Sequence, residues 1–320
     1  MTGGGTTDAA WLHEPVDNYL GSPTDTAYKI PGKNPSFEDL TLRNALQRMR
    51  LAGDVEAYES IAQRFEGAFA ASWVATNPWF LNHVYGGPPT DGGESSAPYS
   101  YTWSFSPGRV QSSRWYLGLD YLDGVAEREL MGVVFPQLRV QYQEGQPVRM
   151  DVVGFYGDEQ KNTSLTPGSL VGKDDDPMVF HGATLSIPSA TAVAKLQSGT
   201  LNIQTGAHAQ RGAGRHPVDA VLGGVNTTLD VTDIITDTSK LELAYGAADA
   251  PATTVSGAAD ASFKFTTPGT SSLDFQLSGV TPNEYSWNDF TNPDTDVTEQ
   301  FTNHVTSVTA IAESDEASAL

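Results

Sequence analysis

The sequence predicts a mainly β protein with two tandem modules of the β-sandwich or β-barrel type, each with a short flanking α-helix. Two observations predict this fold class. Apolar and polar residues alternate with period two in many segments, which indicates strands with one buried face. An offset of 160 residues brings the two halves of the 320-residue chain into register, and such self-similarity indicates a repeated structural unit.

The offset recurs in segments that read as strands, helices and turns. Tyr85-Gly86 falls on Tyr245-Gly246. The other matches are Asn77 with Asp237, Trp103 with Phe263, Trp115 with Phe275 and, with one extra residue, Pro107-Gly108 with Pro268-Gly269. Identity between the copies is low, so the evidence for a duplication is the recurrence of one offset.

These patterns divide the chain into five parts. We expect an N-terminal arm at 1–58, a first module at 59–160, a linker or loop at 161–177 and a second module at 178–312. Residues 313–320 read as a polar, flexible tail, as chain ends often are.

The first module reads as strands that surround one helix. The predicted strands are 65–73, 99–106, 111–122, 137–142 and 148–152. Asn77 is the expected N-cap, Pro78 the first helical residue and Gly86 the C-terminal stop. Turns at Pro107-Gly108 and Glu144-Gly145 are expected to join neighbouring strands as hairpins.

The second module repeats this order with a different ending. The predicted strands are 199–204, 225–231, 260–267, 272–280 and one around 305–311. Asp237 or Ser239 is the expected N-cap, with Glu242 in a capping box and Gly246 as the stop. Pro268-Gly269 joins 260–267 to 272–280, and no counterpart of 148–156 follows.

The charge is strongly acidic, with 39 Asp and Glu against 18 Lys and Arg and a net charge of −21. This balance argues against tight binding to nucleic-acid phosphates, which requires clustered Lys and Arg. A surface of one sign repels itself, and molar salt screens that repulsion. We interpret the composition as an adaptation to high salt; an ordinary acidic surface is the alternative.

No constellation of residues indicates catalysis. The chain has no Cys, and its six His residues show no metal-ligand spacing. Asp174-Asp175-Asp176 lacks the spaced oxygens of a calcium loop, and no Gly-x-Ser-x-Gly motif is present. The sequence therefore predicts no enzyme activity, cofactor or metal. We also expect no secretory signal and no membrane span.

Residues 198–232 are the most distinctive segment. A strand at 199–204 leads into a loop with Arg211 and Gly214-Arg215, followed by a Thr-rich strand at 224–231. A helix ending in Tyr245-Gly246 comes next. In this order the sequence resembles phage tail tube proteins over about residues 60–310. With the acidic composition, the resemblance suggests a tailed virus of a halophilic archaeon.

The resemblance implies a structural role in the virion tail. Members of that family form rings that stack into a tube, and the tube is the conduit for genome ejection. The resemblance also implies that viral DNA passes through the lumen without specific binding and that other tail proteins bind the tube ends. Polar strand residues are the lumen-facing candidates: Asn202, Gln204, Thr228 and Asp230. Ordinary solvent-facing positions are the alternative for these four.

The duplication refines the expected assembly. Because rings in this family are commonly six-fold, three chains with two modules each would form a trimeric, pseudo-hexameric ring; six chains per ring is the rival. Arg211, Arg215, Trp11 and Tyr19 are candidates for contacts between subunits. Other readings are a virion decoration or baseplate component, or a halophilic carbohydrate-binding or hydrolytic β-sandwich.

Overall fold

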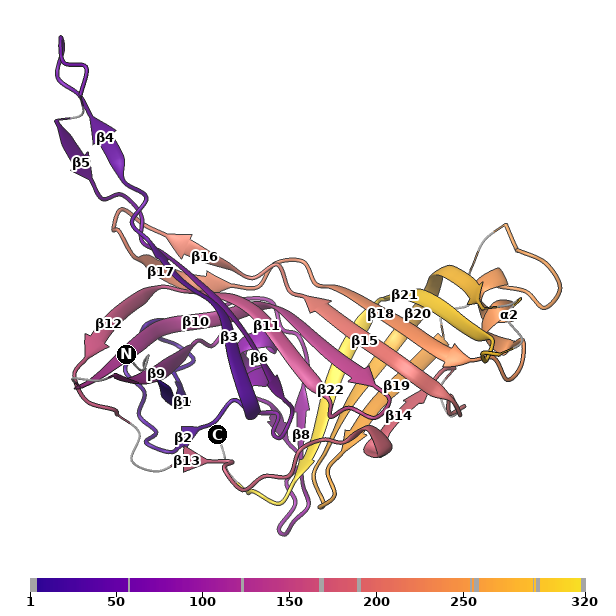
Figure 1. Ribbon diagram of the computed structural model, residues 1–320. Coiled ribbons are helices and arrows are strands. Elements are labelled where there is room, and N and C mark those ends of the chain that lie inside the picture. The colour runs from indigo at the N-terminus through magenta and orange to yellow at the C-terminus, as the bar shows by residue number, and fades with distance from the viewer. Residues whose placement is uncertain are drawn as a thin grey trace.

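Two long strands, β10 (Gly124–Gln143) and β20 (Ser272–Asn288), organise the fold. Each begins in an outer sheet and bends into one shared central sheet. This computed structural model describes residues 5–56, 58–121, 124–166, 170–188, 191–253, 255, 259–289, 291 and 294–317 (Figure 1). Strands dominate these residues, so the prediction of a mainly β protein is confirmed.

The central sheet contains eight antiparallel strands. In spatial order they are β3 (Lys33–Arg43), β6 (Glu66–Val74), β11 (Arg149–Tyr156), β10, β15 (Leu196–Gln204), β18 (Asn226–Ile234), β21 (Thr298–Val305) and β20. The first four come from the first half of the chain and the last four from the second half. The two halves join where β10 pairs with β15.

An outer sheet belongs to each half. The first consists of β2 (Tyr28–Lys29), β1 (Gly5–His13), β9 (Ser113–Tyr121), the start of β10 and β12 (Asp158–Asn162), with β13 (Leu170–Val171) parallel to β2. The second consists of β14 (Ala183–Ser186), β19 (Ala259–Thr266), the start of β20, β22 (Ser307–Ser314), β8 (Tyr99–Trp103) and β7 (Thr90–Asp91). The second outer sheet thus includes two strands from the first half.

Each half also contains a two-stranded hairpin. The first, β4 (Gln47–Met49) and β5 (Glu59–Ile61), lies between β3 and β6 in the chain. The second, β16 (His208–Arg211) and β17 (Pro217–Val221), lies between β15 and β18. Figure 1 shows the β4–β5 hairpin extending away from the sheets. The β16–β17 hairpin packs back on the first half, where the backbone N–H of Val110 donates to the carbonyl of Ala220.

The helices confirm the predicted stops and correct the predicted starts. The helices α1 (Asn82–Tyr85) and α2 (Ser239–Tyr245) each end at a glycine in the left-handed region, Gly86 and Gly246. Before α1, the chain first forms a 3-10 turn, η1 (Trp79–Leu81), so neither Asn77 nor Pro78 has the predicted place. A second 3-10 turn, η2 (Phe180–Gly182), precedes β14.

The start of α2 also differs from the prediction. Its N-cap is Thr238, one residue before Ser239, and Asp237 accepts a hydrogen bond from the backbone N–H of Ser239. The predicted capping box between Ser239 and Glu242 is absent among these described residues. Instead, the hydroxyl of Thr238 donates to the carboxylate of Glu242 at 2.8 Å.

One predicted hairpin is wrong. The strands on either side of Pro107-Gly108 do not pair with each other, because β8 joins β22 while β9 lies between β1 and β10. The hairpins at Glu144-Gly145 and Pro268-Gly269 are confirmed as β10–β11 and β19–β20. A turn signal in sequence marks where the chain reverses, but it does not specify the strand partner.

Two terminal segments contribute more sheet structure than their sequence pattern indicates. The single strand expected around 305–311 is two strands, β21 and β22, separated by Thr306. Within the predicted arm at 1–58, β1 pairs with β9 and β3 pairs with β6. Every residue of β3 is exposed or half-buried, so its sequence lacks the apolar alternation that marks a strand with one buried face.

One large apolar cluster runs through both halves, and a smaller one joins Val110 and Val134 to Ala207 and Ala220. Trp73, Trp115 and Phe135 are fully buried in the first half, and Phe263 and Phe275 are fully buried in the second. The apolar side of the central sheet supplies alternate residues of each strand to this cluster, as the period of two requires. The opposite side of the central sheet is therefore its polar face.

Candidate functional site

The polar face of the central sheet collects the predicted lumen-facing residues. Asn202 and Gln204 on β15 alternate with fully buried Leu201 and Ile203. Thr228 lies directly opposite Asn202 on the neighbouring strand, and Asp230 lies two residues further along it. The structure therefore brings all four candidates into one continuous patch at the middle of the sheet.

Polar residues continue across the full width of this face. One row from β3 to β20 consists of Ser36, Ser72, Asp151, Arg139, Asn202, Thr228, His304 and Thr281. Cross-strand hydrogen bonds tie neighbouring strands together. The Gln137 amide donates to Asn202 Oδ1 at 3.2 Å, and the Thr302 hydroxyl donates to Asp230 Oδ1 at 2.6 Å.

The polar face carries charges of both signs. Arg139 on β10 lies directly opposite Asp151, and Arg149 lies two residues before Asp151 on β11. Asp230 and Glu284 lie on strands of the second half. Burial raises the pKa of Asp151, and the two arginines oppose that shift. Carboxylates thus accompany the arginines, so the face differs from the clustered cationic surfaces that bind phosphates tightly.

The strand order ends at β3 and at β20 in the part of the chain that the structure describes. A strand at the end of a sheet can pair with a strand of another chain. The β3 strand is held in place by two side chains: Arg128 donates to the carbonyl of Leu40 at 2.9 Å, and the Tyr156 hydroxyl donates to the carbonyl of Thr41 at 3.1 Å. The two ends of the sheet are therefore the candidate surfaces for assembly.

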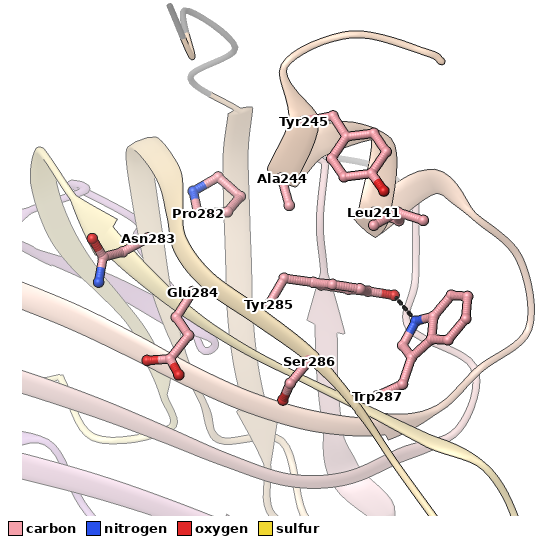
Figure 2. A pocket seen from close by; sticks show the side chains of 9 residues that line it. All are labelled: Leu241, Ala244, Tyr245, Pro282, Asn283, Glu284, Tyr285, Ser286 and Trp287. Atoms are coloured by element: carbon pink, nitrogen blue, oxygen red, sulfur yellow. Dashed lines mark hydrogen bonds between the residues drawn. The ribbon is translucent and has the colours of Figure 1, made fainter. Parts of the chain in front are cut away.

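A groove lies between α2 and the end of β20. It has a volume of about 470 Å³ and is lined by Leu241, Ala244, Tyr245 and Pro282–Trp287. Figure 2 shows Tyr285 and Trp287 on the side of the strand that faces α2, with Glu284 and Ser286 on the opposite side. The indole nitrogen of Trp287 donates to the Tyr285 hydroxyl at 2.6 Å. The groove is therefore a partly aromatic surface beside an open sheet edge.

A buried ion cluster fixes α2 beside this groove. Lys240 Nζ lies 2.7 Å from Asp233 Oδ2 and 2.5 Å from Glu299 Oε1. Burial raises the pKa of Asp233 to about 6, against the lowering effect of Lys240. The Tyr285 hydroxyl donates to the other oxygen of Glu299 at 2.5 Å. These contacts hold the helix, β18, β21 and the aromatic wall of the groove in one arrangement.

The two candidate arginines contact the other half of their own chain. Arg211 donates to the carbonyl of Phe65 at 2.9 Å, and Arg215 donates to the side-chain oxygen of Asn44. His216 next to them stacks on the Phe65 ring, with the ring centroids 5.2 Å apart. The structure thus places Arg211 and Arg215 at the junction between the halves, near the base of the β4–β5 hairpin.

Trp11 and Tyr19 are buried within one chain. Trp11 on β1 is fully buried and lies 6.1 Å from Trp115 between ring centroids, in a stacked arrangement. The Tyr19 hydroxyl donates to the carbonyl of Gly132 at 2.9 Å. The structure therefore separates these two residues from the exposed sheet edges.

The ion clusters were not visible in the sequence. Besides Lys240 with its two carboxylates, Glu14 lies buried beside Arg114, which also bonds Glu129 at 2.9 Å. Burial raises the pKa of Glu14 to about 7. Arg114 is 100 residues from Glu14, and Lys240 is 59 residues from Glu299, so the tertiary fold brings these partners together. Lys240 at the start of α2 was the one sequence signal for a buried ion cluster, because the chain has few Lys residues.

The β4–β5 hairpin exposes an unusual share of apolar side chains. They are Leu46, Met49, Leu51, Val55, Tyr58 and Ile61, and Val55 and Tyr58 are 87% and 73% exposed. Singly exposed apolar residues are common on protein surfaces, whereas a contiguous group indicates an interaction site. The hairpin is therefore a second candidate contact surface.

The described residues form no metal site and no helix that could cross a membrane. Within that part of the chain, no three His, Asp or Glu side chains come together in a geometry that could hold a metal ion. Its helices are also too short or too polar to cross a membrane. The residues that stand out are instead those of the polar face, the sheet edges and the hairpin.

A wide polar sheet face and two open sheet edges are features suited to assembly by pairing of strands between subunits. A family model described as phage tail tube protein matches residues 39–305. The match covers most of the chain, so the protein belongs to the phage tail tube protein family and is a structural component of the virion tail. No curated protein matches the chain.

Proposed function

We propose that three copies of this chain form a closed ring, and that rings stack into the tail tube through which the genome is ejected. In each ring, the central sheets join edge to edge through β3 of one chain and β20 of the next. Such contacts are heterologous, and a ring forms when the rotation between neighbours closes. A ring of six chains is the rival assembly.

The order of strands in the central sheet is the main support for this proposal. The first half contributes β3–β6–β11–β10 and the second contributes β15–β18–β21–β20. In both halves a hairpin joins the first two strands along the chain, and a helix follows the second. This correspondence supports a duplication, in which each chain supplies two ring positions.

We assign the polar face of the central sheet to the lumen. Asn202, Gln204, Thr228 and Asp230 then line the conduit together with the mixed charges beside them. Binding of phosphates through released counterions would slow the passage of DNA. A lining of amides, hydroxyls and balanced charges permits passage without specific binding.

Contacts between stacked rings are assigned to the β4–β5 hairpin. Its exposed apolar side chains, Val55 and Tyr58 among them, become buried when the hairpin meets another ring. Arg211 and Arg215 bind the base of this hairpin within the chain through Phe65 and Asn44, so they position it. We propose no catalytic activity and no cofactor for this structural role.

Electron microscopy of the purified protein in molar KCl tests the proposal. We expect stacked rings or tubes with a central hole. Deletion of residues 50–56 between β4 and β5 is expected to leave single rings that do not stack. Closed shells or spikes would instead support a decoration or baseplate component, and a monomer under all conditions would contradict both assignments.

A further inference from the structure

The groove between α2 and β20 has an occupied counterpart inside the same chain. At the internal junction, β15 lies against β10, with Ile203 opposite Leu138 and Leu201 opposite Val140. All four side chains are fully buried in the apolar cluster that also contains Val84 and Tyr85 of α1. A strand added to the edge of β10 thus covers the apolar surface beside the first helix.

The strands β10 and β20 correspond residue by residue. Each bends at a glycine with positive φ, Gly132 at 71° and Gly279 at 65°. The carbonyl of the residue before each glycine accepts a backbone hydrogen bond at the equivalent place. The N–H of Gly157 donates to the carbonyl of Met131 at 2.9 Å, and the N–H of Thr306 donates to the carbonyl of Ser278 at 3.0 Å.

After each bend the register shifts once, before Gln137 in β10 and before Glu284 in β20. Counting from the two glycines makes Gln137 the counterpart of Glu284, and Leu138 the counterpart of Tyr285.

The strands β3 and β15 correspond in the same way. Their neighbours β6 and β18 both have nine residues and start 160 residues apart, at Glu66 and Asn226. Arg43 lies opposite Glu66, and Gln204 lies opposite Asn226. Continuing along both strands makes Thr41 the counterpart of Asn202, and Leu42 the counterpart of Ile203.

We propose that β3 of a second copy adds to β20 in one defined register and fills the groove beside α2. This inference rests on the proposed ring. Repeating the internal junction places Leu42 of the second copy opposite Tyr285, Thr41 opposite Ser286 and Arg43 opposite Glu284. The strands run antiparallel, as β15 and β10 do.

The chemistry of the two edges matches this register. Leu42 is 42% exposed in the single chain, and it meets the partly aromatic groove formed by Tyr285 and Leu241. Arg43 and Glu284 are both exposed and have opposite charges. Directly opposite charges on paired strands are favourable, whereas like charges are destabilising.

Disulfide formation tests the register, because the chain has no Cys of its own. Directly opposite residues in an antiparallel pair have Cα atoms about 4.5–5.5 Å apart, within the range of a disulfide. We expect Thr41→Cys combined with Ser286→Cys to link chains under mild oxidation. On a non-reducing gel, most of the protein should run as covalent multimers up to the size of one ring.

Two matched controls accompany this variant. Arg139→Cys with Asn202→Cys is the equivalent pair within the chain and should form an internal link without multimers. Thr41→Cys with Glu284→Cys is displaced by two residues along β20 and should give at least ten-fold less linked protein. Efficient linking of the displaced pair in its place would overturn the register.

Ring formation is measured on the same samples by electron microscopy. Rings without links between Thr41→Cys and Ser286→Cys, while the internal control links, would overturn the register and leave the proposed function intact. Absence of rings under all conditions would remove the proposed function and the register together.

A charge reversal provides a second test that does not depend on thiol chemistry. Glu284→Arg and Arg43→Glu should each reduce assembly at least ten-fold, and the double variant should recover most of it. Single variants that assemble normally, or a double variant as defective as the single ones, would contradict the pairing of Arg43 with Glu284.

Discussion

The two helices differ in whether a neighbouring strand covers the apolar surface beside them. All four residues of α1 are buried, whereas Lys240 is the one buried residue of α2 among its seven described residues. The first helix lies next to the filled junction of β10 with β15, and the second lies next to the open edge of β20. The same local fold is thus complete at one site and incomplete at the other.

This difference indicates what the second site requires. The groove beside α1 is closed by β15 of the same chain, and we expect the groove beside α2 to be closed by β3 of another copy. An edge left open carries a risk of uncontrolled aggregation, and closure of a ring removes the edge.

The largest effect is expected from placing a charge on the edge of β3. Leu42→Asp should abolish ring formation, because it places a carboxylate in the groove beside Tyr285 of the neighbouring chain. Since Leu42 is 42% exposed in the single chain, thermal unfolding of the monomer should change little. Light scattering measures assembly. Val16→Asp, 48% exposed and outside both edges, is the matched control and should assemble normally.

The next largest effect is a difference in the free energy of unfolding between variants of the filled groove and of the open groove. Leu201→Ala should lower the free energy of unfolding by about 2–5 kcal/mol, as truncation of a fully buried Leu does. Leu241→Ala, in the open groove, should cost the unassembled chain about 1 kcal/mol or less. Urea unfolding of the two variants measures both. Equal losses would mean that the open groove is ordinary core rather than an interface.

A smaller effect is expected on the stability of the chain at acid pH. Burial lowers the pKa of His83 to about 4, so the folded chain binds fewer protons there than the unfolded chain. Stability therefore falls as the pH drops from about 6.5 towards 4, by about 1.4 kcal/mol per unit for this one group. His83→Gln should remove that contribution.

The pH experiment compares His83→Gln with the natural chain by unfolding at several pH values. Asp233 and Glu14 have raised pKa values, so their contributions fall with rising pH and have the opposite sign. The difference between the two proteins reports His83 together with its effect on His13, whose ring centroid lies 4.9 Å away and whose pKa burial also lowers. A constant difference between pH 6.5 and 4 would contradict the neutral, buried imidazole.

The smallest effect is expected from salt on the unassembled chain. With a net charge of −21, the folded surface repels itself most when the Debye length is long. That length falls from about 10 Å at 0.1 M salt to about 3 Å at 1 M. We expect the melting temperature to rise by several degrees between 0.1 M and 3 M KCl. An unchanged melting temperature would remove the interpretation of high-salt adaptation.

The sequence predicted the elements that carry a strong local signal. Strands with a buried face, such as β6 and β18, show alternation because every second residue enters the core. The ends of both helices were predictable because Gly86 and Gly246 adopt the left-handed conformation that glycine favours. These local signals were enough to predict the mainly β class and the polar patch at Asn202 and Thr228.

The sequence patterns could not predict which distant strands pair with each other. Trp103 and Phe263 match at the offset of 160, but they do not lie on equivalent strands. Trp103 lies on β8 and Phe263 on β19. The equivalent of β19 is β9, because β19 pairs with the start of β20 as β9 pairs with the start of β10. The offset fails there because the two halves have connections of different length. The groove at Tyr285 was missed because its wall combines α2 and β20, which are distant in the chain.

The mass of a single ring tests the central claim most directly. If each chain supplies two positions around the lumen, native mass spectrometry of rings released from tubes should give three copies of the 34.2 kDa chain. Six copies per ring would contradict this account, because each chain would then fill only one position.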